Sequence, residues 1–204
     1  MKKIFILKYG NSGNIGSIVN SLNKNISEKK FKIKISKNHK EILKANALVL
    51  PGVGNNKSIM EILKKSKLDL VIKKFYKSKK PILAICAGLQ ILYNFSEEGN
   101  INCLGILKGK VLKIKESKNT KVPSYGWHKT YTQKKIKWMN KLEYFYYLHS
   151  YYVKTKSNLI MYYNYANKNI PGLIIKKKLI GAQFHPELSG ESGDKIIKYF
   201  LKQI

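Results

Sequence analysis

The sequence places a thiol, an imidazole and a carboxylate in an order that suits nucleophilic catalysis. Cys86 directly follows the apolar run 82–85. His185 and Glu187 lie about a hundred residues further along the chain, two positions apart. A thiol can attack a carbonyl carbon when a histidine accepts its proton and an acid fixes the histidine tautomer. We therefore predict that Cys86, His185 and Glu187 form a catalytic triad.

The residues around Cys86 are small enough to place a nucleophile on a tight turn. Ala84, Ala87 and Gly88 leave room for the strained backbone that such a turn imposes. A helix predicted over residues 87–95 would direct its first N–H groups toward the sulfur, and a thiol is reactive only as the thiolate. The alternative interpretation is that Cys86 simply fills the core, as buried cysteines often do.

A glycine-containing loop is a candidate for binding negative charge. The segment 51–54, Pro-Gly-Val-Gly, follows a predicted buried strand over residues 47–50. Its glycines would let backbone N–H groups face a ligand and stabilise an oxyanion, provided that the loop lies beside Cys86. Such a glycine pair otherwise marks only a tight turn.

The first half of the chain predicts an α/β fold that would bring these segments together. Apolar runs and helical spacing follow the order β-α-β-β-α-β-α, which is typical of a mostly parallel central sheet flanked by helices. The predicted strands cover residues 4–7, 31–35, 47–50 and 82–85, and helical spacing covers residues 15–22, 59–63 with 68–75, and 87–95. Because parallel strands end at one edge of a sheet, Cys86 and the glycine loop would meet there. Asn14 is a candidate N-cap, and His39 falls in a predicted polar loop.

The second half of the chain predicts shorter and partly antiparallel strands. It is rich in Val, Ile and Tyr and has few helix signals. The predicted strands lie within residues 104–115, 143–163, 173–175 and 179–184, and a closing helix covers residues 196–201. Since there is no repeat and no linker, we expect one domain over residues 1–204.

The composition argues against a nucleic-acid partner. The formal net charge of +29 comes from 40 basic residues, all of which are lysine. Specific readers of nucleic acids rely on arginine for bidentate contacts, so lysines spread along the chain predict a solvated surface. An acidic protein partner or an anionic substrate remains compatible with this charge.

The sequence also gives no signal for a membrane or a metal. No apolar run approaches the roughly 20 residues that span a bilayer, and the run 4–7 is too short for a signal peptide. We therefore expect a cytoplasmic protein without membrane contact. The two cysteines, Cys86 and Cys103, form no metal-ligand pattern, so we expect neither metal nor cofactor and no role for Cys103.

Six segments spread over the chain match one known family. They are residues 9–14, 51–54, 86–90 (Cys-Ala-Gly-Leu-Gln), 122–127, 149–152 (His-Ser-Tyr-Tyr) and 183–187 (Gln-Phe-His-Pro-Glu). On these motifs the sequence resembles the class I (triad) glutamine amidotransferases, and among them the glutaminase subunits of imidazole glycerol phosphate synthase. The resemblance implies a flavodoxin-like architecture and a single type-1 amidotransferase domain.

The resemblance implies a role for each residue at a matching position. Cys86 would attack the side-chain amide of glutamine to give a γ-glutamyl thioester and ammonia, with His185 as general acid and base and Glu187 orienting it. The oxyanion hole would include backbone groups at Gly52, Val53 and Ala87, and the glutamine pocket would include Gln90, His149, Ser150 and Tyr151. The family implies no cofactor.

The same resemblance implies a partner subunit. Ammonia would pass into a barrel-shaped synthase (cyclase) subunit in a heterodimer that serves histidine biosynthesis. The expected interface residues are Asn14, Trp127 and Leu188. The sequence departs from the family pattern nearby, since Leu188 replaces a basic residue and Ser124 and His128 replace a histidine and an asparagine.

These departures leave the ammonia acceptor open. A paralogous glutaminase could instead supply a sugar-modifying amidotransferase in surface polysaccharide or glycan biosynthesis. A non-catalytic module that uses the lysine surface, and a free-standing cysteine hydrolase or peptidase, are further alternatives. The intact triad argues against the non-catalytic module, and Gln90 with the glycine loop favours glutamine over a peptide.

Overall fold

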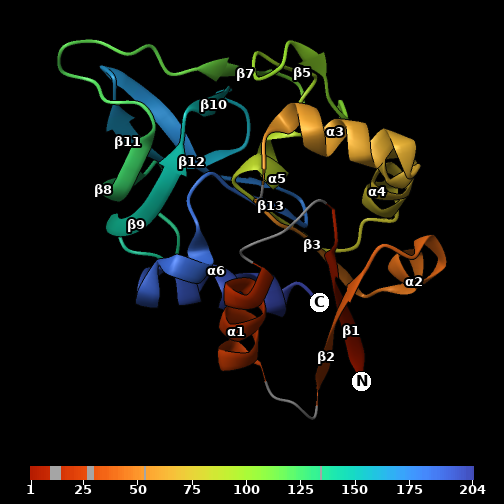
Figure 1. Cartoon of the computed structure of the whole chain (residues 1–204). Helices are drawn as coiled ribbons and strands as arrows, with labels where there is room; N and C mark the ends of the chain where they lie inside the picture. Colours follow the sequence, from red (N-terminus) through yellow and green to blue (C-terminus); the bar gives the residue numbers. More distant parts are fainter. Residues whose placement is uncertain (10–14, 27–29, 53, 134) are drawn as a thin grey trace.

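The computed structural model describes residues 1–9, 15–26, 30–52, 54–133 and 135–204. The two chain termini lie close together in Figure 1, and Lys2 Nζ donates a hydrogen bond to the carbonyl of Ile204 (2.6 Å). Asn14, the predicted N-cap, lies outside the described residues.

A nine-stranded sheet runs through the molecule and includes strands from both halves of the chain (Figure 1). Five parallel strands stand in the order β2 (Phe31–Ser36), β1 (Lys2–Leu7), β3 (Ala47–Leu50), β4 (Ile82–Ile85) and β13 (Leu179–Ala182). Four antiparallel strands continue the sheet: β12 (Lys168–Lys176), β11 (Leu159–Tyr165), β8 (Ser124–Thr132) and β9 (Leu142–His149). The predicted parallel sheet with antiparallel additions is confirmed.

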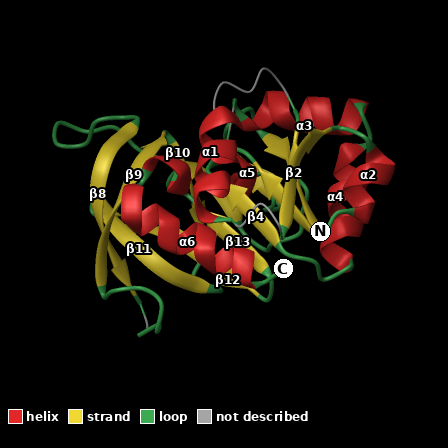
Figure 2. Ribbon diagram, turned by 90° about the horizontal axis from the view of Figure 1, so that it is seen from below, coloured by secondary structure: helices red, strands yellow, loops and turns green. Residues whose placement is uncertain are grey.

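Helices cover both faces of the parallel strands because successive side chains of a strand point to opposite faces. On β1, Ile4 and Ile6 pack with helices α1 (Ile15–Asn25) and α6 (Gly190–Lys202). Phe5 and Leu7 pack on the other face with α2 (His39–Lys44), α3 (Asn56–Lys65) and α4 (Leu68–Lys77). Figure 2 shows α1 and α6 together over one face of the sheet. Within the described ranges, no helix is long and apolar enough to cross a membrane.

A smaller sheet stands beside the carboxyl edge of the parallel strands. Its four strands are ordered β10 (Tyr151–Lys154), β7 (Lys110–Lys113), β5 (Phe95–Ser96) and β6 (Ile101–Asn102). Two short helical turns lie at the same edge, α5 (Ala87–Gln90) after β4 and the 3₁₀ turn η1 (Pro186–Leu188) after β13. Strand β10 follows directly after β9, so it links the smaller sheet to the end of the large one.

Two predictions about local structure are wrong. The helix predicted over residues 87–95 ends at Gln90, because the carbonyls of Ile91 and Leu92 accept hydrogen bonds from the segment 104–107 instead of continuing the helix. Residues 39–44 form helix α2 rather than a polar loop, and Asn38 caps it by accepting from the Glu41 N–H (3.1 Å). An Asn followed three residues later by Glu resembles a capping box, and this signal could have revealed the helix.

Candidate active site

Cys86 stands on a strained turn at the carboxyl end of β4. Its φ of 47° and ψ of −112° are unusual for a residue with a side chain, and its side chain sits in a nearly buried position with 7% exposure. Its N–H donates to the carbonyl of Ala182 (2.7 Å), so the pairing of β4 with β13 holds the turn. This is the strained turn that the small neighbours predicted.

The glycine loop lies directly beside the Cys86 turn. A Cβ atom placed on Gly52 would stand 2.6 Å from the Cβ of Cys86 and 2.6 Å from the carbonyl oxygen of Ile85. A Cβ on Gly88 would stand 2.3 Å from the carbonyl oxygen of Leu50, the last residue of β3. Only glycine permits either approach. Val53 lies outside the described residues, and Ala87 is the buried first residue of α5.

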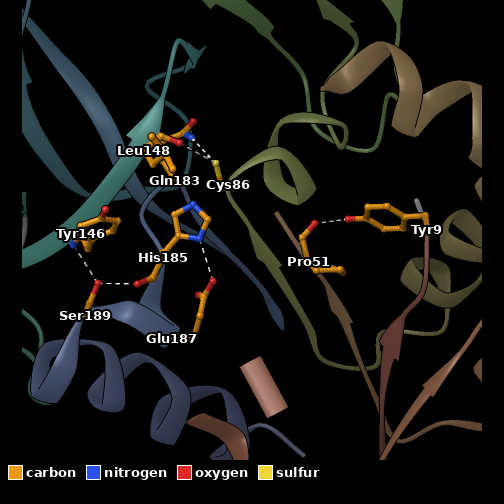
Figure 3. A network of polar contacts seen from close by, with 9 residues as sticks. All are labelled: Tyr9, Pro51, Cys86, Tyr146, Leu148, Gln183, His185, Glu187 and Ser189. Carbon is orange, nitrogen blue, oxygen red and sulfur yellow. Dashed lines mark hydrogen bonds and ion pairs between the residues drawn. The ribbon is translucent and has the colours of Figure 1, made fainter. Parts of the chain in front are cut away.

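Glu187 holds His185 from the side opposite Cys86. His185 Nδ1 lies 2.9 Å from Glu187 Oε1, and only 1% of the Glu187 side chain is exposed. Figure 3 shows the other edge of the imidazole turned toward the Cys86 sulfur. The three predicted triad residues therefore meet at one edge of the sheet, although β4 and β13 supply them from distant parts of the sequence.

Ser189 fixes the backbone on which His185 is mounted. The Ser189 hydroxyl donates to the carbonyl of His185 (2.6 Å) and accepts from the N–H of Tyr146 (3.0 Å). The N–H of His185 in turn donates to the carbonyl of Tyr146 (2.9 Å). The three bonds attach the histidine to strand β9, and Figure 3 shows the two that the Ser189 hydroxyl makes. Ser189 stands four positions after His185 and was not predicted as a site residue.

The electrostatic surroundings of His185 favour its protonated form. Burial alone lowers the pKa of His185, but the negative charge and hydrogen bond of Cys86, together with Glu187, outweigh burial and raise the pKa to about 10. Whenever Cys86 is a thiolate, His185 therefore holds the proton throughout the neutral range. A proton on this ring is available for transfer to a leaving group.

The sulfur of Cys86 has two further polar neighbours. The thiol lies 3.7 Å from the carbonyl oxygen of Leu148, and Gln183 Nε2 donates to the sulfur over 3.7 Å (Figure 3). Tyr9 lies on the other side, where its hydroxyl donates to the carbonyl of Pro51 and thus holds the glycine loop. Burial, and then the negative charge of Cys86, raise the pKa of Tyr9 above its usual range, so this hydroxyl stays protonated.

Gln90 is buried behind Cys86, with its amide bonded to protein groups. Its oxygen accepts from Asn56 Nδ2 (3.0 Å), and its nitrogen donates to the Tyr151 carbonyl (2.7 Å) and to Gln183 Oε1 (3.1 Å). Ser150, another residue predicted to bind glutamine, is half-buried, and its carbonyl accepts from Ile114 (2.8 Å). Gln90 and the strand that begins at Tyr151 are therefore held together near the thiol.

His149 is buried and neutral. Its Nδ1 lies 2.9 Å from the carbonyl oxygen of Tyr151, and its Nε2 lies 2.9 Å from the hydroxyl of Tyr163. Burial is the main reason that the pKa of His149 falls to about 3. Since a carbonyl only accepts, Nδ1 carries the hydrogen and the Tyr163 hydroxyl donates to Nε2. His149 thus orients the Tyr151 carbonyl.

Exposed apolar side chains gather on the β8–β9 hairpin next to the thiol. Trp127 is 55% exposed, Tyr125 is 66% exposed, and Leu188 on η1 is 38% exposed. Tyr146 joins the two aromatic residues of β8, with its ring centroid 5.8 Å from Tyr125 and 6.1 Å from Trp127. We call Tyr125, Trp127, Tyr146, Leu148 and Leu188 the hairpin patch. Asn14, the third predicted interface residue, lies outside the described residues.

Two of the family departures are not on this surface. Ser124 is fully buried, and its hydroxyl lies 3.0 Å from the hydroxyl of Tyr163. His128 is half-buried among the rings of Tyr147, Tyr163 and Tyr165. Both residues pack behind the His149 region, whereas Leu188 is the departure with a well-exposed side chain.

Sequence reasoning missed several residues of the site. Asn56 and Gln183 are fully buried polar residues that reach the site from α3 and from the end of β13. The signal for Gln183 was its position two residues before His185, where strand alternation turns both side chains to the same side. No comparable signal marks Asn56. Among the described residues, no three His, Cys, Asp or Glu side chains cluster as a metal site requires.

Comparisons with known proteins identify relatives over the whole chain. Residues 13–204 match the profile of the family described as "Glutamine amidotransferase class-I". The chain is 40% identical to "Imidazole glycerol phosphate synthase subunit HisH 2" of Methanococcus maripaludis, covering 98% of this chain and 99% of that protein. It is 38% identical to subunit HisH of Lactococcus lactis and 35% identical to that of Prochlorococcus marinus, covering 100% of each protein in both cases.

Solved structures share the fold at lower identity. "Structure of PurLQS from Thermotoga maritima" superimposes with a TM-score of 0.73 at 19% identity, covering 98% of both chains. "Crystal structure of glutamine amidotransferase" gives a TM-score of 0.73 at 15% identity, covering 98% of this chain and 97% of the other.

Proposed function

This chain belongs to the class I glutamine amidotransferase family, and from that premise we propose that it is the glutaminase subunit of an imidazole glycerol phosphate synthase. It would hydrolyse glutamine to glutamate and supply the ammonia to a cyclase subunit. The observation that carries the proposal is the meeting of Cys86, His185 and Glu187 at one edge of the sheet, in a chain related from end to end to HisH subunits. We also propose that residues 1–204 act as one domain, since one sheet joins both halves.

The proposed reaction begins with attack by the Cys86 thiolate on the side-chain carbonyl carbon of glutamine. The resulting oxyanion collapses as His185 donates its proton to the leaving nitrogen, and ammonia departs from a γ-glutamyl thioester. His185 then accepts a proton from water, which attacks the thioester and releases glutamate. Glu187 orients the imidazole and stabilises its charge in both steps.

We propose that backbone N–H groups of the two turns beside the sulfur stabilise the oxyanion. Ala87 supplies the first N–H of α5. Because the first N–H groups of a helix have no hydrogen-bond acceptor within that helix, this group can face the oxyanion. The glycine loop supplies the others, at Gly52 and at Val53. The close contact between Gly52 and Cys86 supports this assignment, because it places the loop against the reacting atom.

We further propose that the cyclase covers the hairpin patch. Large exposed aromatic side chains are common in interface centres, and Trp is among the residues whose loss weakens binding most. The patch includes Leu148, whose carbonyl faces the sulfur, so a partner seated there would lie over the site that releases ammonia. Leu188 adds an apolar contact in place of the cation usual in this family.

A glutaminase that serves a sugar-modifying enzyme is the second candidate. Three departures from the family pattern, Leu188, Ser124 and His128, favour it, but Ser124 is fully buried and His128 is half-buried among tyrosine rings. The alternative therefore rests mainly on Leu188, which is 38% exposed.

One experiment tests the assignment and its rival together. The chain is purified with a HisF-type cyclase, and the glutamine-dependent formation of imidazole glycerol phosphate is measured. We expect turnover with the wild type and none with Cys86→Ala. Cys103→Ala is the matched control and should retain activity, because burial raises the pKa of Cys103 to about 11 and leaves it an unreactive thiol. Glutamine hydrolysis without any stimulation by the cyclase would favour the sugar-modifying alternative.

A further inference from the structure

Three side-chain amides lie in a row between helix α3 and the Cys86 sulfur. Asn56 Nδ2 donates to Gln90 Oε1 over 3.0 Å. Gln90 Nε2 donates to Gln183 Oε1 over 3.1 Å, and Gln183 Nε2 donates to Cys86 Sγ over 3.7 Å. All three amides are buried. We call Asn56, Gln90 and Gln183 the amide chain.

A backbone carbonyl fixes the direction of the amide chain. The carbonyl of Tyr151 can only accept, and Gln90 Nε2 donates to it over 2.7 Å. Gln90 must therefore turn its oxygen toward Asn56 and its second N–H toward Gln183. Reversing a single amide would bring two oxygens or two N–H groups together in a buried place, which is unfavourable.

The consequence is that Gln183 presents an N–H group to the sulfur, rather than an oxygen. An N–H donor stabilises a negative charge, whereas an amide oxygen at the same position would repel it. The opposite contact of the sulfur, the Leu148 carbonyl, can interact favourably only with the neutral thiol. Gln183 therefore favours the charged form of Cys86, and the other two amides keep it in that orientation.

We propose that Gln183 is a further catalytic residue that stabilises the Cys86 thiolate, and that Asn56 is a positioning residue acting on it through Gln90. The proposal rests on the proposed function, in which Cys86 is the nucleophile. Other groups also act on the charge at Cys86: His185 with Glu187 behind it, and the buried hydroxyls of Tyr9 and Tyr163. None of these groups belongs to the amide chain, so a substitution in the amide chain does not replace any of them.

The test follows the alkylation of Cys86 in the full chain by iodoacetamide across a pH series. Peptide mass spectrometry reports the rate of alkylation at Cys86. Cys103, whose pKa burial raises to about 11, should stay unlabelled and so reports whether a variant has opened its core. Gln183→Met keeps the side-chain length and removes the N–H donor. We therefore expect the pH at which the alkylation rate of Cys86 is half-maximal, its midpoint, to rise by about one pH unit. Asn56→Leu should move it in the same direction by a smaller amount. Gln203→Met, which changes an amide near the C-terminus, should leave it unchanged.

A midpoint that stays constant in both amide-chain variants would overturn the proposal. If Gln183→Met fails to fold, Gln183→Glu retains the shape and should raise the midpoint further, since it places a carboxylate beside the sulfur. Alkylation needs no glutamine turnover, so the two proposals fail separately. A wild-type complex that does not hydrolyse glutamine would contradict the glutaminase assignment, whereas a constant midpoint would contradict only the role of the amide chain.

Discussion

Gly52 approaches Cys86 so closely that a methyl group on Gly52 would stand 2.6 Å from the Cβ of Cys86. The two residues belong to different loops, one after β3 and the other after β4, and the parallel pairing of these strands brings them together. Leu50 pairs with Ala84 in this register, so strands β3 and β4 leave the sheet at the same level. The position of Cys86, the proposed nucleophile, therefore depends on the absence of a side chain at Gly52.

We predict that Gly52→Ala abolishes most glutaminase activity. The added methyl group would also meet the carbonyl oxygen of Ile85 at 2.6 Å, so the backbone of one loop must move and the sulfur leaves its position beside the loop. The matched control is Gly16→Ala in helix α1, where a Cβ would meet nothing within 4 Å. The control should keep full activity and gain up to about 1 kcal/mol in the free energy of unfolding. Steady-state glutamine hydrolysis and urea unfolding measure both results, and an active Gly52→Ala would contradict the proposed loop function.

Replacing Glu187 by glutamine should lower kcat by roughly 10²–10⁴-fold while the protein stays folded. Glu187 raises the pKa of His185, so its loss should also move the alkaline limb of the pH–rate profile to lower pH. Glu191→Gln, an exposed carboxylate in the first turn of α6, is the control and should change neither quantity. A Glu187→Gln enzyme with a normal pH–rate profile would argue against its role in holding the imidazolium.

The hairpin patch makes a prediction about association. Trp127→Asp should weaken binding to the cyclase by at least about tenfold, because it replaces a large apolar contact by a charge. Leu70→Asp on α4 is the control, since Leu70 is 59% exposed but lies outside the patch. Titration calorimetry gives both affinities, and thermal unfolding shows whether each variant is stable. Equal weakening by both substitutions would mean that the cyclase does not recognise the patch.

The buried His149 predicts a specific acid sensitivity. Its pKa is lowered to about 3, mainly by burial, so between about pH 6.5 and pH 3 the unfolded chain binds a proton that the native protein excludes. The free energy of unfolding should therefore fall as the pH falls through this window, by up to about 1.4 kcal/mol per pH unit. His128, whose pKa burial also lowers, acts in the same direction.

The comparison of wild type with His149→Gln isolates this contribution. The variant should lose less stability than the wild type between pH 7 and pH 5 in chemical denaturation. The ring signals of His149 in NMR should not titrate above about pH 4 in the native protein. A ring that titrates near pH 6.5 would show that the imidazole is not held neutral by burial.

The sequence was sufficient to predict the parallel core and the two motifs that carry the proposed triad. Short apolar runs such as residues 47–50 and 82–85 are buried on both sides, which makes them recognisable as central parallel strands. The residue types and the order of Cys86, His185 and Glu187 then indicated their roles in catalysis. Local rules failed where tertiary contacts replace local ones, as at Ile91, whose carbonyl bonds to Leu104 instead of extending α5.

What the sequence determined by itself was therefore the chemistry: which residues can attack, transfer a proton and orient the base. Only the tertiary structure decided which groups surround them. Gln183 faces the sulfur because β13 pairs with β4, and Asn56 reaches Gln90 because α3 packs at the same edge of the sheet. Hydrogen-bond direction in a buried amide depends on partners far apart in the chain, so no local sequence pattern encodes it.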